Sequence, residues 1–471
     1  MNTYPLFLAG EFLTTKETLA VTHKYENITF ANTYLADEKV LEYAIKRGVE
    51  AKEEMKNLSS LDKFEILNSI HLKITADRLR LAEILSIESA KPIKYALSEI
   101  DRAAQTFLIA AEEAKRLPKE YMSLDWTANG KGKEGLVKYF PVGLVAGIAP
   151  FNFPLNLAVH KIAPAIAAGC PIILKPASST PLSTLELAKI IAETKLPKGA
   201  LSILPMDRKI GNLLVTDKRI NLLSFTGSPE IGWEIKKQSD KKKVVLELGG
   251  NAGVIITPSA KVEDIIEKCI TGAFAYSGQI CIHAQRFYVH ESVFEKFKKA
   301  MVQRAKKLEF GNPLKPETEI SDMIDEANAI RVENWITEAK NLNATLLCGG
   351  KRTGKFIEPT ILTDTTKQMK VNSEEIFGPV ICIEPYSGTI ENAIDKINDS
   401  KFGLQCGVFT DSMEELNKCY NTINVGGIIH NDVPTLRFDQ MPYGGVKESG
   451  LGREGVKYAI YDMLEAKVLV R

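Results

Sequence analysis

Short apolar segments alternate with helical stretches through the middle of the chain. The first four apolar segments are residues 142–148, 171–175, 200–204 and 220–226. Strands buried on both faces are apolar throughout, and parallel strands need a crossover connection between them. The pattern therefore predicts repeated βα units that form a parallel sheet covered by helices, as in nucleotide-binding α/β domains.

A second βα series follows the first and predicts a second α/β domain. Its expected strands are 252–256, 287–290, 345–347 and 380–385, and its expected helices are 262–276, 293–308 and 330–341. Upstream of both series, residues 38–117 have the apolar spacing of amphipathic helices. With 471 residues, 45% of them hydrophobic and 25% charged, the chain is long enough for two or three ordinary globular domains.

Two segments outside these series point to assembly. Residues 118–141 are polar and aromatic and contain Asn129-Gly130, which predicts a protruding β-hairpin. Residues 463–470 nearly alternate in polarity and predict a strand with no later partner in the chain. Because an unpaired strand edge is a template for another chain, we expect this tail to pair with the hairpin of another subunit.

Composition excludes several classes of partner. Lys and Arg total 60 against 59 Asp and Glu, so the formal charge of +1 favours neither nucleic acid nor an acidic membrane. The seven cysteines are odd in number and lack CxxC spacing, which predicts neither a disulfide framework nor a metal site. The N-terminal residues do not match a signal peptide, and no apolar run is long enough for a membrane span. We expect a cytoplasmic protein.

Three residues could carry chemistry on a carbonyl group. Cys281 follows a bend at Gly278, Glu247 interrupts an apolar strand, and Asn152 lies at the end of another predicted strand. Each has a structural alternative: a buried small cysteine, a paired carboxylate and a helix cap. Together they supply a nucleophile, a base and an oxyanion donor, which are the groups needed to form and hydrolyse a thioester.

Signals for phosphate binding are weaker. Gly227 and Ser228 follow a predicted strand and open a predicted helix, so their N–H groups could bind a pyrophosphate. The alternative is an ordinary strand–turn–helix junction, since no complete G-x-G-x-x-G is present. Lys175 ends another strand, where it either contacts a ribose or phosphate or is a solvated charge.

In this order along the chain, seven motifs resemble those of the aldehyde dehydrogenase superfamily, and the resemblance covers essentially the whole sequence. The motifs are Pro150-Phe151-Asn152-Phe153-Pro154, Lys175-Pro176-Ala177-Ser178, Phe225-Thr226-Gly227-Ser228, Leu246-Glu247-Leu248-Gly249-Gly250-Asn251, Gly278-Gln279-Ile280-Cys281, Glu374-Glu375-Ile376-Phe377-Gly378-Pro379 and Tyr443-Gly444-Gly445-Val446-Lys447-Glu448-Ser449-Gly450.

The resemblance implies roles for individual residues. Cys281 is the nucleophile, Glu247 is the general base, and Asn152 forms the oxyanion hole with the Cys281 backbone N–H. The cofactor is NAD or NADP, and the implied cofactor residues are Pro150, Lys175, Ser178, Gly227, Ser228, Leu248, Gly249, Glu375 and Phe377. The implied substrate residues are Leu157, His160, Ile280, Ile282, Arg437 and Tyr443.

The implied α/β fold has two Rossmann-type parallel-sheet domains and a β-hairpin oligomerisation region. Residues 1–117 and 142–248 form the coenzyme domain, and residues 249–454 form the catalytic domain. Residues 118–141 and 455–471 form the oligomerisation region of a homodimer or homotetramer.

Three departures from the family pattern bear on specificity. The segment 204–208 replaces a common Gly-x-Gly near the adenine, and Ser178 stands where strictly NAD-dependent relatives often have Glu. Because a Glu there would repel a 2′-phosphate, we expect Ser178 to allow use of both NAD and NADP. His283, Gln285 and the segment 434–438 resemble a subgroup that includes lactaldehyde- and phosphonoacetaldehyde-type dehydrogenases.

The favoured function is NAD(P)-dependent oxidation of a short aldehyde to its acid. The alternatives are a CoA-acylating dehydrogenase, which usually lacks the base at Glu247, a thiol esterase, and a binding protein with a fossil site. Ile280 and Ile282 predict a narrow apolar throat. Polar contacts at the mouth of this throat, for a hydroxylated or anionic aldehyde, are predicted from His160, Arg437 and Tyr443. The alternative is that Arg437 pairs with a surface carboxylate such as Asp439. For His283 we expect a pocket or packing role.

Overall fold

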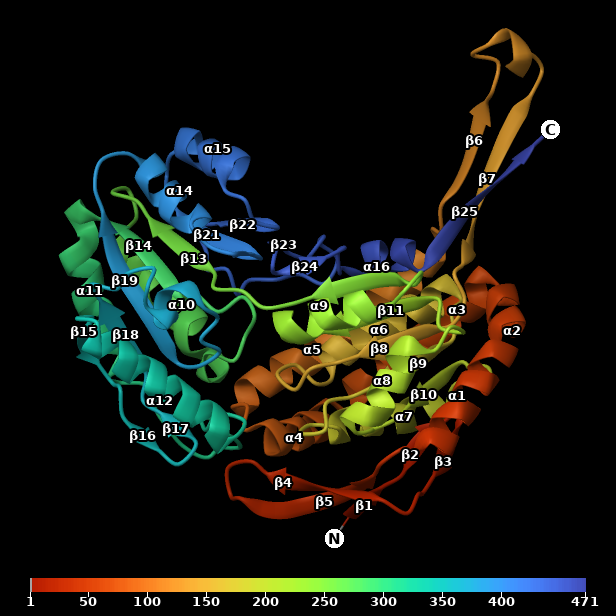
Figure 1. The fold of residues 1–471 in the computed structure, drawn as a ribbon, viewed down its shortest axis with the longest axis horizontal. Coiled ribbons are helices and arrows are strands. Elements are labelled where there is room, and N and C mark those ends of the chain that lie inside the picture. Colours follow the sequence, from red (N-terminus) through yellow and green to blue (C-terminus); the bar gives the residue numbers. More distant parts are fainter. Residues whose placement is uncertain (1) are drawn as a thin grey trace.

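The computed structural model describes residues 2–471. Two α/β bodies lie side by side, and a narrow three-stranded sheet projects away from both (Figure 1). None of the helices in residues 2–471 combines the length and apolar character needed to cross a membrane.

The first body is built on an eight-stranded sheet with a parallel centre. Parallel strands β8 to β12 have the spatial order 3-2-1-4-5, so the chain reverses direction across the sheet between β8 and β11, where doubly wound folds bind ligands. The four strands predicted from the first series are confirmed. From edge to edge the strands are β24 (Gly450–Leu451), β12 (Lys243–Glu247), β11 (Leu222–Thr226), β8 (Val145–Ile148), β9 (Ile172–Lys175), β10 (Leu201–Ile203), β2 (Leu6–Leu8) and β3 (Glu11–Leu13).

Helices cover both faces of this sheet because successive strand residues point to opposite sides. Val145 and Ile172 belong to the core on one face, whereas Ala146 and Ile173 belong to the core on the other. The first core includes α3 (Ser60–Ala76), α4 (Arg78–Ser89), α5 (Ile93–Ala114), α6 (Asn156–Ala168), α7 (Leu182–Ala192) and α16 (Val456–Asp462). The second includes α1 (Glu38–Glu50), α8 (Arg208–Thr216) and α9 (Pro229–Gln238), and α2 (Lys52–Asn57) follows α1.

The second body is built on a seven-stranded sheet that is parallel except at one edge strand, β15. The second βα series is confirmed by this sheet. Its strands in spatial order are β15 (Thr345–Cys348), β18 (Thr360–Thr363), β19 (Val380–Tyr386), β14 (Arg286–His290), β13 (Gly253–Ile256), β21 (Gln405–Phe409) and β22 (Gly427–His430). Its helices are α10 (Val262–Phe274), α11 (Glu291–Ala305), α12 (Glu326–Asn341), α13 (Lys370–Ser373), α14 (Ile390–Asn398) and α15 (Met413–Thr422).

Smaller sheets complete the fold. An N-terminal sheet, which was not predicted from the sequence, packs below the first body (Figure 1). Its strands are β1 (Asn2–Tyr4), β5 (Ile28–Tyr34) and β4 (Thr18–His23). The two-stranded pairs are β16 (Arg352–Thr353) with β17 (Phe356–Ile357), and β20 (Phe402–Gly403) with β23 (Val446–Lys447).

The projecting sheet confirms the predicted hairpin and corrects the prediction for the tail. Strands β6 (Lys119–Ser123) and β7 (Glu134–Pro141) form the hairpin, with the short 3-10 helix η1 (Ala128–Gly130) near its tip. The tail strand β25 (Leu464–Val470) pairs antiparallel with β7 of its own chain. Expected pairing of the tail with another subunit is therefore wrong here, because α16 packs on α5 and α6 and delivers the tail directly to β7.

Candidate active site

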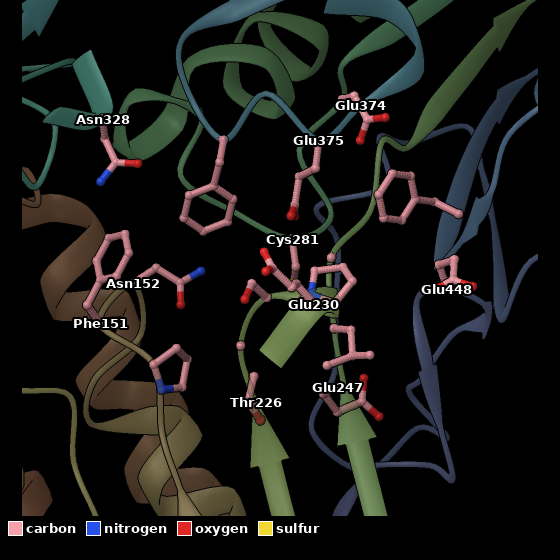
Figure 2. A pocket seen from close by; sticks show the side chains of 18 of the residues that line it. Phe151, Asn152, Thr226, Glu230, Glu247, Cys281, Asn328, Glu374, Glu375 and Glu448 are labelled. Carbon is pink, nitrogen blue, oxygen red and sulfur yellow. The ribbon is translucent and has the colours of Figure 1, made fainter. Parts of the chain in front are cut away.

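A cavity of about 820 Å³ lies where the two bodies meet. The first body contributes the carboxyl ends of β8, β11 and β12, which flank the reversal point of its sheet. The second body contributes Cys281, one face of α12 and the segment 374–377 (Figure 2). Residues far apart in sequence therefore meet at the place where this type of sheet binds nucleotides.

Cys281 lies in the loop between η2 (Ala275–Gly278) and β14. Tyr276, Ser277 and Gly278 all have positive φ values, of 49°, 53° and 67°. A Cβ atom on Gly278 would meet the Gly378 carbonyl oxygen at 2.1 Å, so this turn requires glycine. The tight turn presents Cys281 to the cavity.

The Cys281 thiol differs from the other thiols of the protein. It is partly exposed, whereas the other six cysteines are buried, as expected for small apolar residues. The dry surroundings of Cys281 raise the pKa of its thiol to about 11. Its Sγ lies 3.1 Å from the hydroxyl of Tyr443, whose presence opposes that rise.

Asn152 lies on the loop that follows β8, and its side chain points into the cavity (Figure 2). Its Nδ2 donates to the Gln279 carbonyl at 3.0 Å, and its Oδ1 accepts from the Phe153 N–H at 3.1 Å. An amide nitrogen carries two N–H groups, so a second donor remains for an oxyanion. The alternative role as a helix cap is wrong, because Glu99 accepts from Leu155 and Asn156 at the start of α6.

A buried ion pair supports the Asn152 loop. Lys91 and Glu99 are paired with both side chains fully shielded from solvent. The Lys91 Nζ also donates to the Asn152 carbonyl at 2.6 Å and lies 3.8 Å from the centre of the Phe153 ring. Neither residue was predicted from the sequence, because nothing in the local pattern of Lys91 or Glu99 indicates the loop that they hold.

Glu247 ends β12 and borders the cavity below Cys281 (Figure 2). It is 3% exposed, and neither carboxyl oxygen has a hydrogen-bond partner among the described residues. Burial, helped by the charge of Glu454, raises the pKa of Glu247 well above its usual value. A raised pKa makes the carboxylate form a stronger base than an ordinary glutamate, which suits it to take a proton from water.

Arg437 and His160 are buried, in contrast to their expected place at the mouth of a substrate channel. Arg437 is paired with Glu454 at 3.0 Å, and its Nε is 4.0 Å from Asp439. Asp439 is itself buried and binds His160 Nε2 at 2.8 Å and Arg102 at 2.6 Å. The alternative pairing of Arg437 with Asp439 is therefore found, but this carboxylate is buried and not at the surface, and Glu454 is the closer partner.

Seven of the nine residues implied for the cofactor border the cavity. They are Pro150, Gly227, Ser228, Leu248, Gly249, Glu375 and Phe377. Lys175 and Ser178 lie outside this lining: Lys175 is half-buried at the end of β9, where burial lowers its pKa, and Ser178 is exposed in the next turn.

The cavity wall fits a dinucleotide. The first turn of α9 begins at the cavity, and no side chain caps its free N–H groups, which suits a pyrophosphate. A Cβ atom on Gly249 would meet Glu375 Oε2 at 2.2 Å, so glycine leaves room for that carboxyl group. Burial raises the pKa of Glu375 to about 7, and among the described residues only the Gly250 N–H donates a hydrogen bond to it, at 3.0 Å. Its remaining acceptor capacity suits ribose hydroxyls.

The other residues implied for substrate binding surround Cys281. Leu157 borders the cavity, and Ile280, Ile282 and Tyr443 are buried in one small apolar cluster beside Cys281. His283 binds the Ala273 carbonyl at 2.7 Å and makes no contact with the thiol that would activate it. Burial lowers the pKa of His283 to about 4, so a packing role accounts for this residue.

Further cavity residues were missed in the sequence. Three half-buried residues on one face of α12 border the cavity: Asn328, Arg331 and Trp335. Their spacing of three and four residues was the available signal. Lys161 was signalled by its position as a lone charge in the apolar helix α6, where it binds Thr226 at 2.7 Å.

The site combines a cysteine, an amide and a buried carboxyl group at the reversal point of a doubly wound sheet. This combination defines a nucleotide-dependent enzyme with a cysteine nucleophile. The profile of the aldehyde dehydrogenase family matches residues 12–469. The chain belongs to the aldehyde dehydrogenase family, and it is an NAD(P)-dependent enzyme.

Similar proteins agree with this placement. A 3-sulfolactaldehyde dehydrogenase of Priestia aryabhattai is 40% identical over 469 residues, covering 99% of this chain and 98% of the relative. A lactaldehyde dehydrogenase of Methanococcus aeolicus is 39% identical, covering 99% of each. The solved structure of aldehyde dehydrogenase 21 from Physcomitrella patens with the product succinate has a TM-score of 0.98 and 43% identity, covering 100% of this chain and 98% of that one. The resemblance to the lactaldehyde-type subgroup is confirmed.

Proposed function

We propose that the protein oxidises a short hydroxylated or anionic aldehyde to its carboxylic acid through a covalent bond to Cys281. The observation that carries this proposal is the meeting of Cys281, Asn152 and Glu247 at one cavity that also fits a dinucleotide. No two of these residues lie on the same element, so their convergence is a property of the fold.

Each catalytic residue acts on a defined atom. The Cys281 thiolate adds to the aldehyde carbon, and the developing oxyanion accepts hydrogen bonds from the free N–H of Asn152 and the Cys281 backbone N–H. When bound, NAD or NADP supplies the hydride acceptor. Glu247 then takes a proton from the water that hydrolyses the thioester. Glu375 and the first turn of α9 would hold the ribose and pyrophosphate, and Lys175 and Ser178 would contact the adenosine ribose.

The substrate class follows from the relatives. The relatives are named for lactaldehyde and 3-sulfolactaldehyde, which are short and hydroxylated, and the second is anionic. Arg437 packs against the ring of Tyr443, and Tyr443 in turn contacts Cys281, so a positive charge lies behind the tyrosine. The Nε of Arg437 has no hydrogen-bond partner among the described residues. Glu454 and Asp439 pair with this charge, so the inference of an anionic group on the aldehyde rests on the second relative.

An absorbance assay for the reduced cofactor tests the function. A panel of lactaldehyde, sulfolactaldehyde, succinic semialdehyde and unsubstituted aldehydes of equal length is compared with and without CoA. The proposal predicts reduction of cofactor without CoA, and faster turnover of the substituted short aldehydes. Dependence on CoA would instead favour the acylating reaction, and ester cleavage without cofactor reduction would favour a thiol esterase.

We also propose a homodimer or homotetramer in the cytoplasm. The projecting sheet exposes apolar side chains at its tip and along β25, with Trp126 88% and Leu469 58% exposed. Seven free thiols suit a reducing compartment. Light scattering of the native chain and of a Trp126→Ser, Leu469→Ser variant tests assembly, and the proposal predicts a smaller species for the variant. A monomeric native chain would contradict it.

A further inference from the structure

Tyr443 contacts the nucleophile directly. Its Oη lies 3.1 Å from Cys281 Sγ, and this hydroxyl has no other hydrogen-bond partner among the described residues. The tyrosine is 3% exposed and shares an apolar cluster with Cys281, so its hydroxyl is shielded from bulk water. In such surroundings a single hydrogen bond has more effect than at a surface.

The chemistry of the two groups fixes the direction of this bond when the thiol is ionised. A thiolate can only accept a hydrogen bond, whereas a phenol can donate one. Burial and the neighbouring Cys281 keep the pKa of Tyr443 well above its usual value, so the phenol retains its own proton. The proton lost by Cys281 therefore goes to solvent, and Tyr443 donates to the sulfur that remains.

Arg437 holds and polarises the tyrosine. Its guanidinium carbon lies 3.6 Å from the centre of the Tyr443 ring, on the ring face, and Glu454 fixes the guanidinium at 3.0 Å. A cation on the ring face is attracted to the π electrons and makes the hydroxyl a better donor. The other ionisable groups facing Cys281 are Glu247 and Glu375, and the negative charge of each acts against ionisation of the thiol, so the hydrogen bond from Tyr443 opposes their effect.

We propose that Tyr443 is a catalytic residue of the first step, whose hydroxyl donates a hydrogen bond to Cys281 and stabilises the thiolate, and that Arg437 is its positioning residue. The inference rests on the proposed role of Cys281 and deepens it. It gives Tyr443 a function on the nucleophile in place of a polar contact with the substrate.

Alkylation of the thiol by iodoacetamide tests this inference without substrate or cofactor. Rates are measured against pH for the native protein, for Tyr443→Phe and for the matched control Tyr386→Phe, a tyrosine of equal burial in another core. Cys281→Ala gives the background from the six buried cysteines. Tyr443→Phe removes one oxygen and keeps the ring, and the melting temperature checks that its fold is retained.

The expected result is a shift of the alkylation profile of Tyr443→Phe to higher pH by about one unit, since a hydrogen bond to a charged group is lost. At neutral pH a shift of about one unit lowers the fraction of Cys281 thiolate about tenfold. A thiolate of higher pKa is about threefold more nucleophilic, so the alkylation rate falls about threefold. Tyr386→Phe keeps the native profile. Coincident alkylation profiles for Tyr443→Phe and the native protein would overturn the inference. Tyr443 would then only line the pocket. If the native protein did not oxidise any aldehyde, the proposed function would be wrong. The alkylation rates of the native protein and Tyr443→Phe would still test the role of Tyr443.

Discussion

Glu247 and Glu454 are neighbouring buried carboxyl groups whose pKa values are displaced in opposite directions. Burial and the charge of Glu454 raise the pKa of Glu247. Burial alone would also raise the pKa of Glu454, but Lys161 at 3.3 Å and Arg437 at 3.0 Å outweigh it and hold that pKa well below its usual range. One carboxyl group can therefore exchange a proton while its neighbour stays charged.

This pair predicts the pH dependence of hydrolysis. Only the carboxylate form of Glu247 acts as a base, so the rate falls as the pH drops through its raised pKa. Glu454→Gln removes a repelling charge and leaves Lys161 and Arg437 unbalanced, which lowers the pKa of Glu247. The acid limb of kcat is expected to move to lower pH by about one unit. A pH profile of kcat measures the shift. Glu11→Gln, at an exposed glutamate outside the cavity, is the control, and an unmoved or upward-shifted limb would contradict the account.

Cys281→Ala is expected to abolish aldehyde oxidation and any ester cleavage. Only the covalent step loses its nucleophile, so cofactor binding stays close to native. Steady-state rates and fluorescence titration with NAD and NADP measure the two effects. Turnover above a few per cent of the native rate would show that another group attacks the aldehyde.

Ser178→Glu tests cofactor selection. The native chain is expected to use both NAD and NADP, and the new carboxylate would repel the 2′-phosphate of NADP. We expect kcat/KM for NADP to fall about tenfold or more, equivalent to about 1.4 kcal/mol, with little change for NAD. A native preference for NAD of about a thousandfold, or equal losses for both cofactors, would refute the role of Ser178.

Removing one partner of the Lys91–Glu99 pair is expected to destabilise the protein strongly. In Glu99→Ala the Lys91 ammonium remains buried without its partner, which costs about 3–5 kcal/mol of the free energy of unfolding. Urea denaturation measures the change. The matched control is Glu11→Ala, which breaks an exposed ion pair in which Lys198 Nζ lies 2.6 Å from Glu11 Oε1. This variant is expected to change the free energy of unfolding little. Equal effects of both variants would show that burial of the pair is unimportant.

Local sequence patterns predicted most of the fold. Strands such as β8 and β11 are mostly apolar because both of their faces are covered, and that pattern is visible in the chain. The N-terminal strands β1 and β3 are only three residues long and mostly exposed, so they carry no clear periodicity. The partner of β25 was assigned wrongly, because alternation identifies a strand and does not identify its neighbour.

The candidate site was predictable where a motif carries it. Asn152 and Glu247 lie at strand ends and Cys281 follows a glycine turn, and the cavity brings the three together as the resemblance implied. Arg437 was misplaced because its burial depends on Glu454, 17 residues later in the chain. Contacts of this kind depend on tertiary packing, which periodicity and spacing do not record.

The central claim is that Cys281 carries the acyl group and Glu247 is needed to release it. Glu247→Gln mixed with an aldehyde and cofactor is expected to accumulate a thioester, because the amide cannot take a proton from water. Mass spectrometry of the quenched protein tests this directly. The account predicts an acyl adduct on the peptide containing Cys281, formed together with a burst of reduced cofactor. An unmodified Cys281, with no burst and slow formation of reduced cofactor, would contradict it.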